Sequence, residues 1–274
     1  MYKVYKTGQD FLDENLNIIR NDPLGATFFE ANVKMIPQCD KGNYAVRVEV
    51  DGSLLLAIHV GEYPLVLYGS EKCVDEFAQV VTQSKLQFNR TIGSYDISNA
   101  FLQAYERLVG GSHKVNLSMD IMYCDKVNYC DTTGVEQATT KDIEEITQLV
   151  VDFNFEAMSE KSTWGGIFDK ISHNIDNYAI LRVNEKIVSI GYSNTEGTGL
   201  HRISNVYTKP EHRNKGYSRK VVTYLTERAL KSGNLPCLHV DQHNPVSNHL
   251  YQTIGYTYGK SRYEMIYIPA HIEE

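Results

Sequence analysis

The residue types with the clearest chemical potential lie between Val206 and Ser218, where the sequence reads Val-Tyr-Thr-Lys-Pro-Glu-His-Arg-Asn-Lys-Gly-Tyr-Ser. A β-branched and aromatic run stops there at a proline turn, and an amphipathic helical pattern follows. The first N–H groups of a helix lack intrahelical partners, and the helix dipole adds about half a positive charge at that end. Gly216 lets an anion approach the backbone, and Arg213 and Lys215 supply cationic donors. This spacing predicts a cradle for a diphosphate group.

A second segment follows in the same region of the chain. Residues 238–244 read as a strand that ends in asparagine, residues 247–251 as a short helix with a Leu-Tyr pair, and residues 254–256 as an Ile-Gly-Tyr step into a last strand. In this order and at these distances, the two segments resemble the GNAT superfamily of acyl-CoA-dependent N-acetyltransferases, whose phosphate loop has the pattern Arg/Gln-x-x-Gly-x-Gly/Ala. Ser218 departs mildly from that pattern, because a hydroxymethyl group still fits near a phosphate and can donate to it.

The resemblance implies that acetyl-CoA is the cofactor and that the acceptor is a primary amine of a small molecule, amino acid or peptide. The cofactor-binding residues that it carries over are Val206, Tyr207, Thr208, Arg213, Asn214, Lys215, Gly216, Tyr217, Ser218, Asn244 and Asn248. In the family, the strand that ends at Thr208 is splayed and pairs with the cofactor like an extra β partner. Asn244 also has a structural interpretation, as the N-cap residue ahead of Pro245.

Amide formation needs a free-base amine, a stabilised oxyanion and a proton for the departing thiolate. Tyr251 matches the family tyrosine whose phenol faces the CoA sulfur, so the resemblance makes it the general acid; the alternative is a tyrosine packed in the core. Two histidines are candidate bases. His239 replaces a glutamate of the ribosomal-protein N-terminal acetyltransferases, with Asp241 able to orient it, and His201 lies where histone-type relatives place a glutamate. Either histidine can instead be an ordinary strand residue, and a water chain can replace both.

The order of expected elements repeats once along the 274 residues. In the first half, helical patterns lie near 10–20, 71–88 and 98–109, and strand patterns near 44–50, 54–60, 63–68, 91–95 and 115–123. In the second half, helical patterns lie near 140–158, 216–231 and 245–253, and strand patterns near 178–183, 187–194, 202–208, 236–241 and 261–268. Asp51-Gly52 predicts a primed hairpin turn, and residues 184–186 take its place in the second half.

This repeat predicts a mixed α+β fold of two tandem GNAT-like domains, each a twisted, mostly antiparallel sheet flanked by helices. The domains would span residues 1–125 and 135–274, with a linker at 126–134. Where the second half has its glycine loop, the first has Tyr68-Gly69-Ser70-Glu71-Lys72, with an acidic residue at the helix start that would repel a diphosphate. We therefore expect the first half to be a degenerate domain that has lost the cofactor and walls the substrate cleft.

Composition limits the partners. A net charge of −7 disfavours a nucleic-acid partner and slightly favours a cationic amine. No apolar run approaches the length of about 18 residues that a membrane span needs, and the polar N-terminus does not resemble a signal peptide, so a cytoplasmic location is expected. Five scattered cysteines without a Cys-x-x-Cys pair predict reduced thiols and no metal site. A homodimer is left open.

Two further segments border the expected acceptor cleft. Trp164-Gly165-Gly166 is expected in a substrate-binding loop, with a buried aromatic anchor as the alternative. Glu156 and Glu160 either attract a cationic amine or form a solvated helix face. Three functions remain in play: N-acetyl transfer from acetyl-CoA to an amine, a non-catalytic acyl-CoA-binding regulatory module, and transfer from another acyl-CoA donor.

Overall fold

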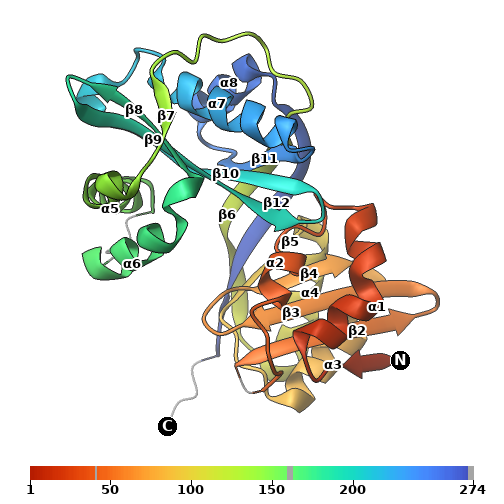
Figure 1. Ribbon diagram of the computed structural model, residues 1–274. Helices are drawn as coiled ribbons and strands as arrows, with labels where there is room; N and C mark the ends of the chain where they lie inside the picture. The colour runs from red at the N-terminus through yellow and green to blue at the C-terminus, as the bar shows by residue number, and fades with distance from the viewer. Residues whose placement is uncertain (41, 159–162, 271–274) are drawn as a thin grey trace.

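All strands of the described chain belong to one mixed sheet. The computed structural model describes residues 1–40, 42–158 and 163–270. Across the sheet (Figure 1) the strands lie in the order β1 (Tyr2–Val4), β2 (Asn43–Val50), β3 (Ser53–Val60), β4 (Leu65–Gly69), β5 (Arg90–Gly93), β12 (Thr257–Ile268), β6 (Ser112–Tyr123), β11 (Leu235–Asp241), β10 (Leu200–Thr208), β9 (Lys186–Gly197), β8 (Tyr178–Val183) and β7 (Val135–Gln137). Neighbouring strands are antiparallel except for β4 with β5 and β10 with β11. The expected α+β class and mostly antiparallel sheet are confirmed.

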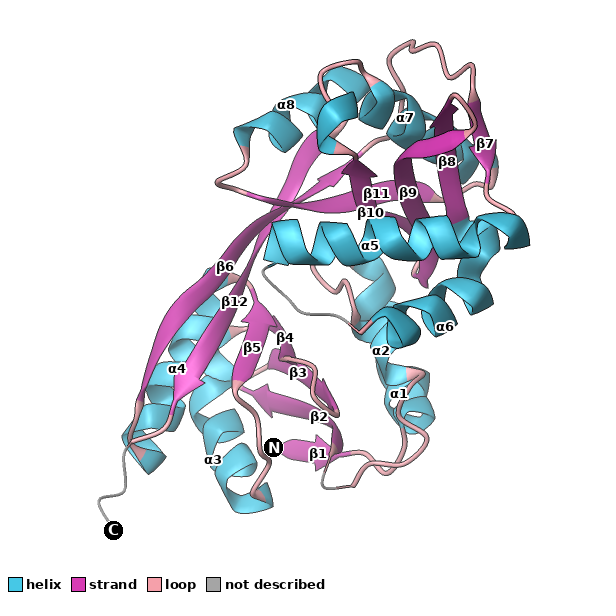
Figure 2. Cartoon of the chain, turned by 90° about the vertical axis from the view of Figure 1, so that its left-hand side faces the viewer, coloured by secondary structure: helices cyan, strands magenta, loops and turns pink. Residues whose placement is uncertain are grey.

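The two halves of the chain exchange their last strands in the middle of this sheet. β12, from the end of the second half, lies between β5 and β6 of the first half, and β6 lies between β12 and β11. Figure 2 shows these two long strands running side by side from one half of the molecule to the other. The halves thus share one hydrogen-bonded sheet, where the sequence suggested a sheet for each. Residues 124–134, between β6 and β7, contain no helix or strand.

Helices cover both faces of the sheet. α1 (Gly8–Asn21), α2 (Phe29–Val33), α5 (Ile143–Met158) and α6 (Trp164–Asn174) lie on one face, called here the α5 face, and α3 (Val74–Ser84), α4 (Tyr95–Val109), α7 (Tyr217–Lys231) and α8 (Pro245–Ile254) lie on the other, the α7 face. Short 3-10 turns occur at Glu71–Cys73, Thr140–Asp142, Ile175–Asn177 and Pro210–His212. On β3, Leu55 packs under α3 and α4 while Leu56 packs under α1 and α2, because successive strand residues point to opposite faces.

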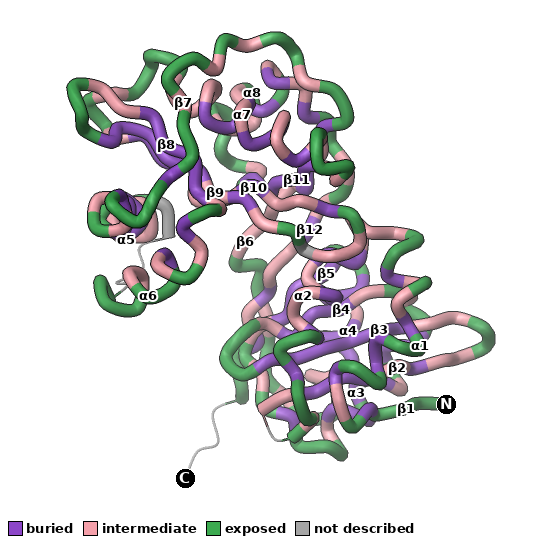
Figure 3. Tube along the Cα trace, viewed as in Figure 1, coloured by how far each residue is buried: buried purple, intermediate pink, exposed green. Residues whose placement is uncertain are grey.

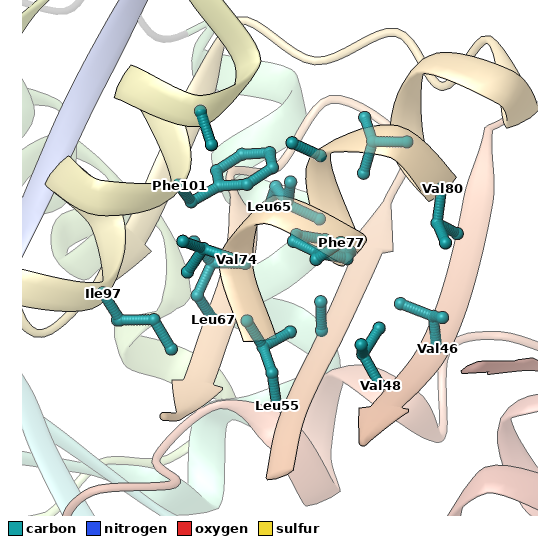
Figure 4. Close-up of a cluster of buried hydrophobic side chains, with 14 of the residues drawn as sticks. Val46, Val48, Leu55, Leu65, Leu67, Val74, Phe77, Val80, Ile97 and Phe101 are labelled. Atoms are coloured by element: carbon teal, nitrogen blue, oxygen red, sulfur yellow. The ribbon is translucent and has the colours of Figure 1, made fainter. Parts of the chain in front are cut away.

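Apolar packing fixes the sheet between its two helical layers. Figure 3 shows the buried residues concentrated along the central strands and on the inner sides of the helices. In the first half, Val46, Val48 and Leu55 meet Phe77 of α3 and Phe101 of α4, whose ring centres lie 4.7 Å apart (Figure 4). Burying one such side chain contributes about 1.5–3 kcal/mol to folding. This packing on both faces holds the strands, and therefore the strand ends of the candidate site, in place.

Most of the expected helices and strands are present, with ends shifted by a few residues. The turn residues Asp51, Gly52, Asn184 and Glu185 all have a positive φ, as a primed hairpin turn requires. The elements β1, α2 and β7 were not expected, because with 3, 5 and 3 residues they are too short for a periodic pattern.

Residues 164–166 correct the sequence analysis. They form the first turn of α6 and not a substrate-binding loop. Trp164 stacks on Phe168 one turn later, with ring centres 5.0 Å apart, and this contact stabilises the helix start. The alternative interpretation, a buried aromatic anchor, is also wrong, because Trp164 is 43% exposed.

Candidate functional site

The candidate site lies where β10 and β11 separate. These strands pair in parallel over four residues, and the pairing ends at Ile203 and Leu238. β10 runs on to Thr208, but its register against β9 shifts just past Ser204, where Asn205 has a φ of 49°. A bulge of this kind bends the strand away from its neighbour. The backbone of β10 beyond the bulge therefore lines an opening between the two strand ends, which we call the slot.

The loop that joins β10 to α7 has the geometry of an anion cradle. Asn214 and Gly216 have φ values of 61° and 77°, so the backbone curls into a concave turn. The first helical hydrogen bond runs from the Lys220 N–H to the Gly216 carbonyl at 3.1 Å, which leaves the N–H groups of residues 217–219 without an acceptor inside the helix. A Cβ atom at Gly216 would meet nothing within 4 Å. An anion can reach these N–H groups directly.

Arg213, the cation of the loop pattern, is engaged by neighbouring groups. Its guanidinium forms an ion pair with Glu156 of α5 at 2.7 Å and lies 5.6 Å from the ring centre of Tyr207. Its Nε donates to the Thr208 carbonyl at 3.0 Å. The hydrogen bond from Arg213 lowers the pKa of Glu156, which keeps this carboxylate charged. Lys215 is exposed beside the cradle, and its Nζ donates to the Glu211 carbonyl at 3.4 Å.

The other loop and strand residues frame the slot mainly through packing. The Ser218 and Thr208 hydroxyls share a hydrogen bond of 2.7 Å, which ties the first turn of α7 to the end of β10. Val206 and Tyr217 pack against the core under α7, whereas Tyr207 packs under α5. The small side chain of Ser218 therefore holds the end of β10 close to the start of α7.

Tyr251 lies in α8, on the α7 face beneath the slot. It is 8% exposed, and its ring meets that of Tyr256 edge-on with centres 6.0 Å apart. Burial raises the pKa of Tyr251 to about 12. Within the described part of the chain, its hydroxyl makes no hydrogen bond. The phenol is therefore protonated at neutral pH. Its O–H donates to no other group of the described chain.

Asn244 and Asn248 shape the turn between β11 and α8. The Asn244 side chain accepts a hydrogen bond from the Ser247 N–H at 3.0 Å, so it is an N-cap. The Asn248 amide donates to the carbonyls of Asp241 at 3.1 Å and Asn244 at 2.9 Å. Both side chains hold the helix start that carries Tyr251.

His239 lies on the α5 face of β11, opposite Tyr251. Its ring meets that of Phe28 at 84°, with centres 5.0 Å apart, and its Nε2 atom is buried without a hydrogen-bond partner in the described chain. Burial, followed by the nearby Arg202 and Arg262, holds the pKa of His239 well below its usual range. Asp241, which the sequence suggested as its partner, pairs with His243 at 3.2 Å instead.

Comparisons with known proteins agree with this geometry. Residues 195–265, which include β10, the cradle, β11 and α8, match the model of the FR47-like protein family. An acetyltransferase of the GNAT family from Colwellia psychrerythraea superposes with a TM-score of 0.61 at 13% identity, covering 98% of this chain and 99% of that one. The chain has the GNAT fold. A GCN5-related N-acetyltransferase from Sphaerobacter thermophilus gives a TM-score of 0.68 at 13% identity, with 100% and 98% covered, and a Drosophila protein gives 0.65 at 12%, with 97% and 98% covered. Among curated proteins, no sequence matches significantly.

Within this GNAT fold, His201 is not brought to the slot. It stands near the start of β10, in the part of the strand that still pairs with β11, two residues before that pairing ends at Ile203. Burial and the neighbouring Arg228 of α7 lower its pKa, and its Nδ1 lies 3.4 Å from the Thr195 hydroxyl. This histidine lies beside the paired part of β10 and not in the opening between the strand ends.

Sequence reasoning missed several residues that surround the slot in the GNAT fold. Phe28 contacts His239, and Arg202 and Arg262 lie over the Phe28 ring, although these residues are distant in sequence. Glu156, which the sequence analysis placed at the acceptor cleft or on a solvated helix face, forms an ion pair with Arg213. Glu160 lies outside the described residues. In the described chain, no helix is long and apolar enough to cross a membrane, and no three or more His, Cys, Asp or Glu side chains are placed to hold a metal ion.

Proposed function

We propose that the chain is an N-acetyltransferase that transfers the acetyl group of acetyl-CoA to a primary amine of a small molecule, amino acid or peptide. The observation that carries this proposal is the slot between β10 and β11, which opens beside the cradle at the start of α7. The N–H groups of residues 217–219, with Lys215, would bind the diphosphate, and the backbone of β10 beyond Ser204 would pair with the amide groups of the cofactor arm. Bound acetyl-CoA supplies an acyl group activated as a thioester.

Tyr251 is the proposed general acid. As the amine nitrogen bonds to the thioester carbon and the carbon–sulfur bond breaks, the phenol proton would pass to the departing sulfur. The raised pKa of about 12 keeps this proton in place at neutral pH until the thiolate forms. Backbone N–H groups at the β10 bulge would stabilise the oxyanion.

His239 is the proposed base, in preference to His201. It lies on the face of β11 opposite Tyr251, so the proton donor and acceptor stand on two sides of the slot. Its lowered pKa keeps the imidazole neutral and able to accept a proton near pH 7. The same shift makes it a weak base, which favours an amine that is already partly deprotonated.

The first half is proposed to be a degenerate domain of residues 1–125 that binds no cofactor, with residues 135–274 as the catalytic domain. The first half also contains a parallel strand pair, β4 and β5, whose pairing ends after two residue pairs. The loop after α1 lies beside the ends of these two strands. A Cβ at Gly259 would lie 2.9 Å from the Leu24 side chain. Arg262 donates to the Gly25 carbonyl, and Lys260 pairs with Asp22 at 2.5 Å. A cavity of about 260 Å³ is left there.

Release of free thiol from acetyl-CoA tests the proposed function. The protein is mixed with acetyl-CoA and a panel of amines, and thiol is measured against an amine-free control, while calorimetric titration counts binding sites. We expect one site per chain and amine-dependent thiol release. One binding site without amine-dependent thiol release would favour the non-catalytic acyl-CoA-binding module. Faster thiol release from a longer acyl-CoA would favour another acyl donor. Two equivalent binding sites would contradict the proposal that the first half is degenerate.

A further inference from the structure

Three hydroxyl groups, which we call the hydroxyl chain, connect the core of the second half with the start of α7. The Ser189 hydroxyl of β9 lies 2.8 Å from the Thr208 hydroxyl at the end of β10, and the Thr208 hydroxyl lies 2.7 Å from that of Ser218 in the first turn of α7. Ser189 is fully buried, Thr208 is 7% exposed and Ser218 is partly exposed. The hydroxyl chain therefore runs from the protein interior to the cradle.

The number of protons fixes the direction of the hydroxyl chain. Each hydroxyl has one proton to donate, so the chain has one proton more than its two hydrogen bonds use. Among the described residues, the Ser189 hydroxyl has Thr208 as its one hydrogen-bond partner, and a buried O–H without an acceptor is costly. Ser189 therefore donates to Thr208.

The same argument applies to the second hydrogen bond of the hydroxyl chain. If Ser218 donated to Thr208, the Thr208 proton would lack an acceptor in a side chain that is only 7% exposed. Donation from Thr208 to Ser218 instead leaves the unpaired proton on Ser218, the most exposed of the three side chains. The Ser218 O–H is thus the donor with which the chain ends.

This last O–H lies beside the free backbone N–H groups of the cradle. The Ser218 N–H is one of those that have no acceptor inside α7. Only Cα and Cβ separate the hydroxyl oxygen of Ser218 from this nitrogen, so an anion bound to the N–H is within reach of the O–H. In the described part of the chain, the Ser218 hydroxyl contacts no polar group other than the Thr208 hydroxyl. Its proton can therefore go to a phosphate oxygen, which accepts strong hydrogen bonds.

We propose that the Ser218 hydroxyl donates a hydrogen bond to the diphosphate of the cofactor, and that Ser189 and Thr208 are positioning residues that hold its proton toward the cradle. This inference rests on the proposed use of acetyl-CoA and adds a side-chain donor to the backbone N–H groups. A hydroxyl that accepts a hydrogen bond is polarised and becomes a stronger donor, so the two inner hydroxyls also strengthen the outer one. Ser218 stands where the loop pattern has glycine or alanine, neither of which can supply this donor.

Ser218→Ala removes the proposed donor and leaves the backbone of the cradle in place. The Kd for acetyl-CoA in calorimetric titration should rise roughly 10–100-fold, the range for a hydrogen bond to a charged group. S-acetylpantetheine carries the same thioester and arm but no diphosphate, so its Kd should not change. Ser218→Thr keeps the hydroxyl and should keep most of the affinity for acetyl-CoA. Thermal unfolding without ligand verifies that each variant is folded.

Ser189→Ala tests the orientation of the proton. Without the Ser189 proton, Thr208 can accept from Ser218, so the Ser218 O–H points to the cradle for only part of the time. Apparent affinity scales with the fraction of the competent state, and the Kd for acetyl-CoA should rise about 2–5-fold. Added to Ser218→Ala, the same change should have no effect. Ser193→Ala is the matched control, because Ser193 is another fully buried serine of β9 whose hydroxyl accepts from Arg228 at 3.0 Å; it should leave the Kd unchanged.

The ligands and variants separate this inference from the proposed catalysis. An unchanged Kd for acetyl-CoA in Ser218→Ala, or an equal loss for acetyl-CoA and S-acetylpantetheine, would overturn the Ser218 donor. A Ser189→Ala variant that binds like Ser193→Ala would overturn the positioning role. Binding of acetyl-CoA that depends on Ser218, without thiol release to any amine, would support the donor and defeat the proposed acyl transfer. Thiol release with binding independent of Ser218 would do the reverse, and an unmodified protein that does not bind acetyl-CoA would overturn both.

Discussion

Gly216 offers the sharpest test of the cradle. Its φ of 77° lies in the left-handed region, where a side chain costs about 1–2 kcal/mol, and the space for a Cβ is open. Replacement by Gln or by Glu should therefore cost the same backbone strain without a clash. At about 2–4 °C per kcal/mol for a chain of this size, both variants should melt roughly 2–8 °C below the unmodified protein.

Only the Glu variant adds a charge next to the diphosphate. With charges about 5–8 Å apart and an effective dielectric constant of about 20–40, the repulsion is about 1–3 kcal/mol. The Kd for acetyl-CoA should then be roughly 5–150-fold weaker in Gly216→Glu than in Gly216→Gln. Screening should remove most of this difference near 1 M salt, where the Debye length is about 3 Å.

Calorimetric titration with acetyl-CoA at low and high salt measures both Kd values, and thermal unfolding without cofactor verifies that the two variants are equally stable. Equal affinities in the Gln and Glu variants would refute the reasoning, because the diphosphate would then bind away from Gly216. A difference that does not respond to salt would point to altered loop structure and not to charge.

Other changes test separate parts of the site. Tyr251→Phe should lower kcat by about 10²–10⁴-fold in thiol-release assays and leave the calorimetric Kd for acetyl-CoA unchanged, because only the proton donor is lost. Glu156→Gln removes the charge that engages Arg213, so acetyl-CoA should bind about 2–5-fold more tightly; weaker binding would mean that Glu156 maintains the loop. The folded state lowers the pKa of His239, so the unfolded chain binds the extra proton and stability should fall as pH drops below about 6.5. In urea unfolding, His239→Gln should show a smaller fall, and an identical pH dependence would contradict the shift. Residues 135–274 alone lack β6, so they should aggregate or melt without cooperativity in calorimetry.

Local features of the site could be predicted from the sequence because short-range geometry determines them. The positive φ values at Asn214 and Gly216 and the asparagine cap at Asn244 depend on a few consecutive residues. The same locality explains one failure. Asp241 shares a strand face with His239 but bonds to His243 two residues on, since a turn residue reaches its own backbone and neighbours more readily than a side chain further along the strand.

Long-range features could not be predicted in this way. The alternating pattern of β6 and β12 indicates which of their side chains share a face. It does not indicate which strand lies beside them, so the exchange of strands between the two halves could not be predicted from it. The contacts of Phe28 with Arg202, Arg262 and His239 have the same character, because these four residues lie in four separate segments. The place of His201 in the paired part of β10, before the strands separate at Ile203, also follows from the sheet pairing and not from local sequence.

The exchanged strands give the first half a role that needs no cofactor of its own. β6 pairs with β11 as far as Asp241, and the next N–H, of Gln242, donates to the Ser118 carbonyl at 3.0 Å, so a first-half strand flanks β11 at the slot. On the other side, the buried carboxylate of Glu30 in α2 accepts from the Thr198 N–H at 2.8 Å and fixes the hairpin that leads into β10. Both strands that frame the slot are thus positioned by the first half. Through β6 and α2, the proposed degenerate half would set the geometry in which the proposed chemistry takes place, without binding a cofactor itself.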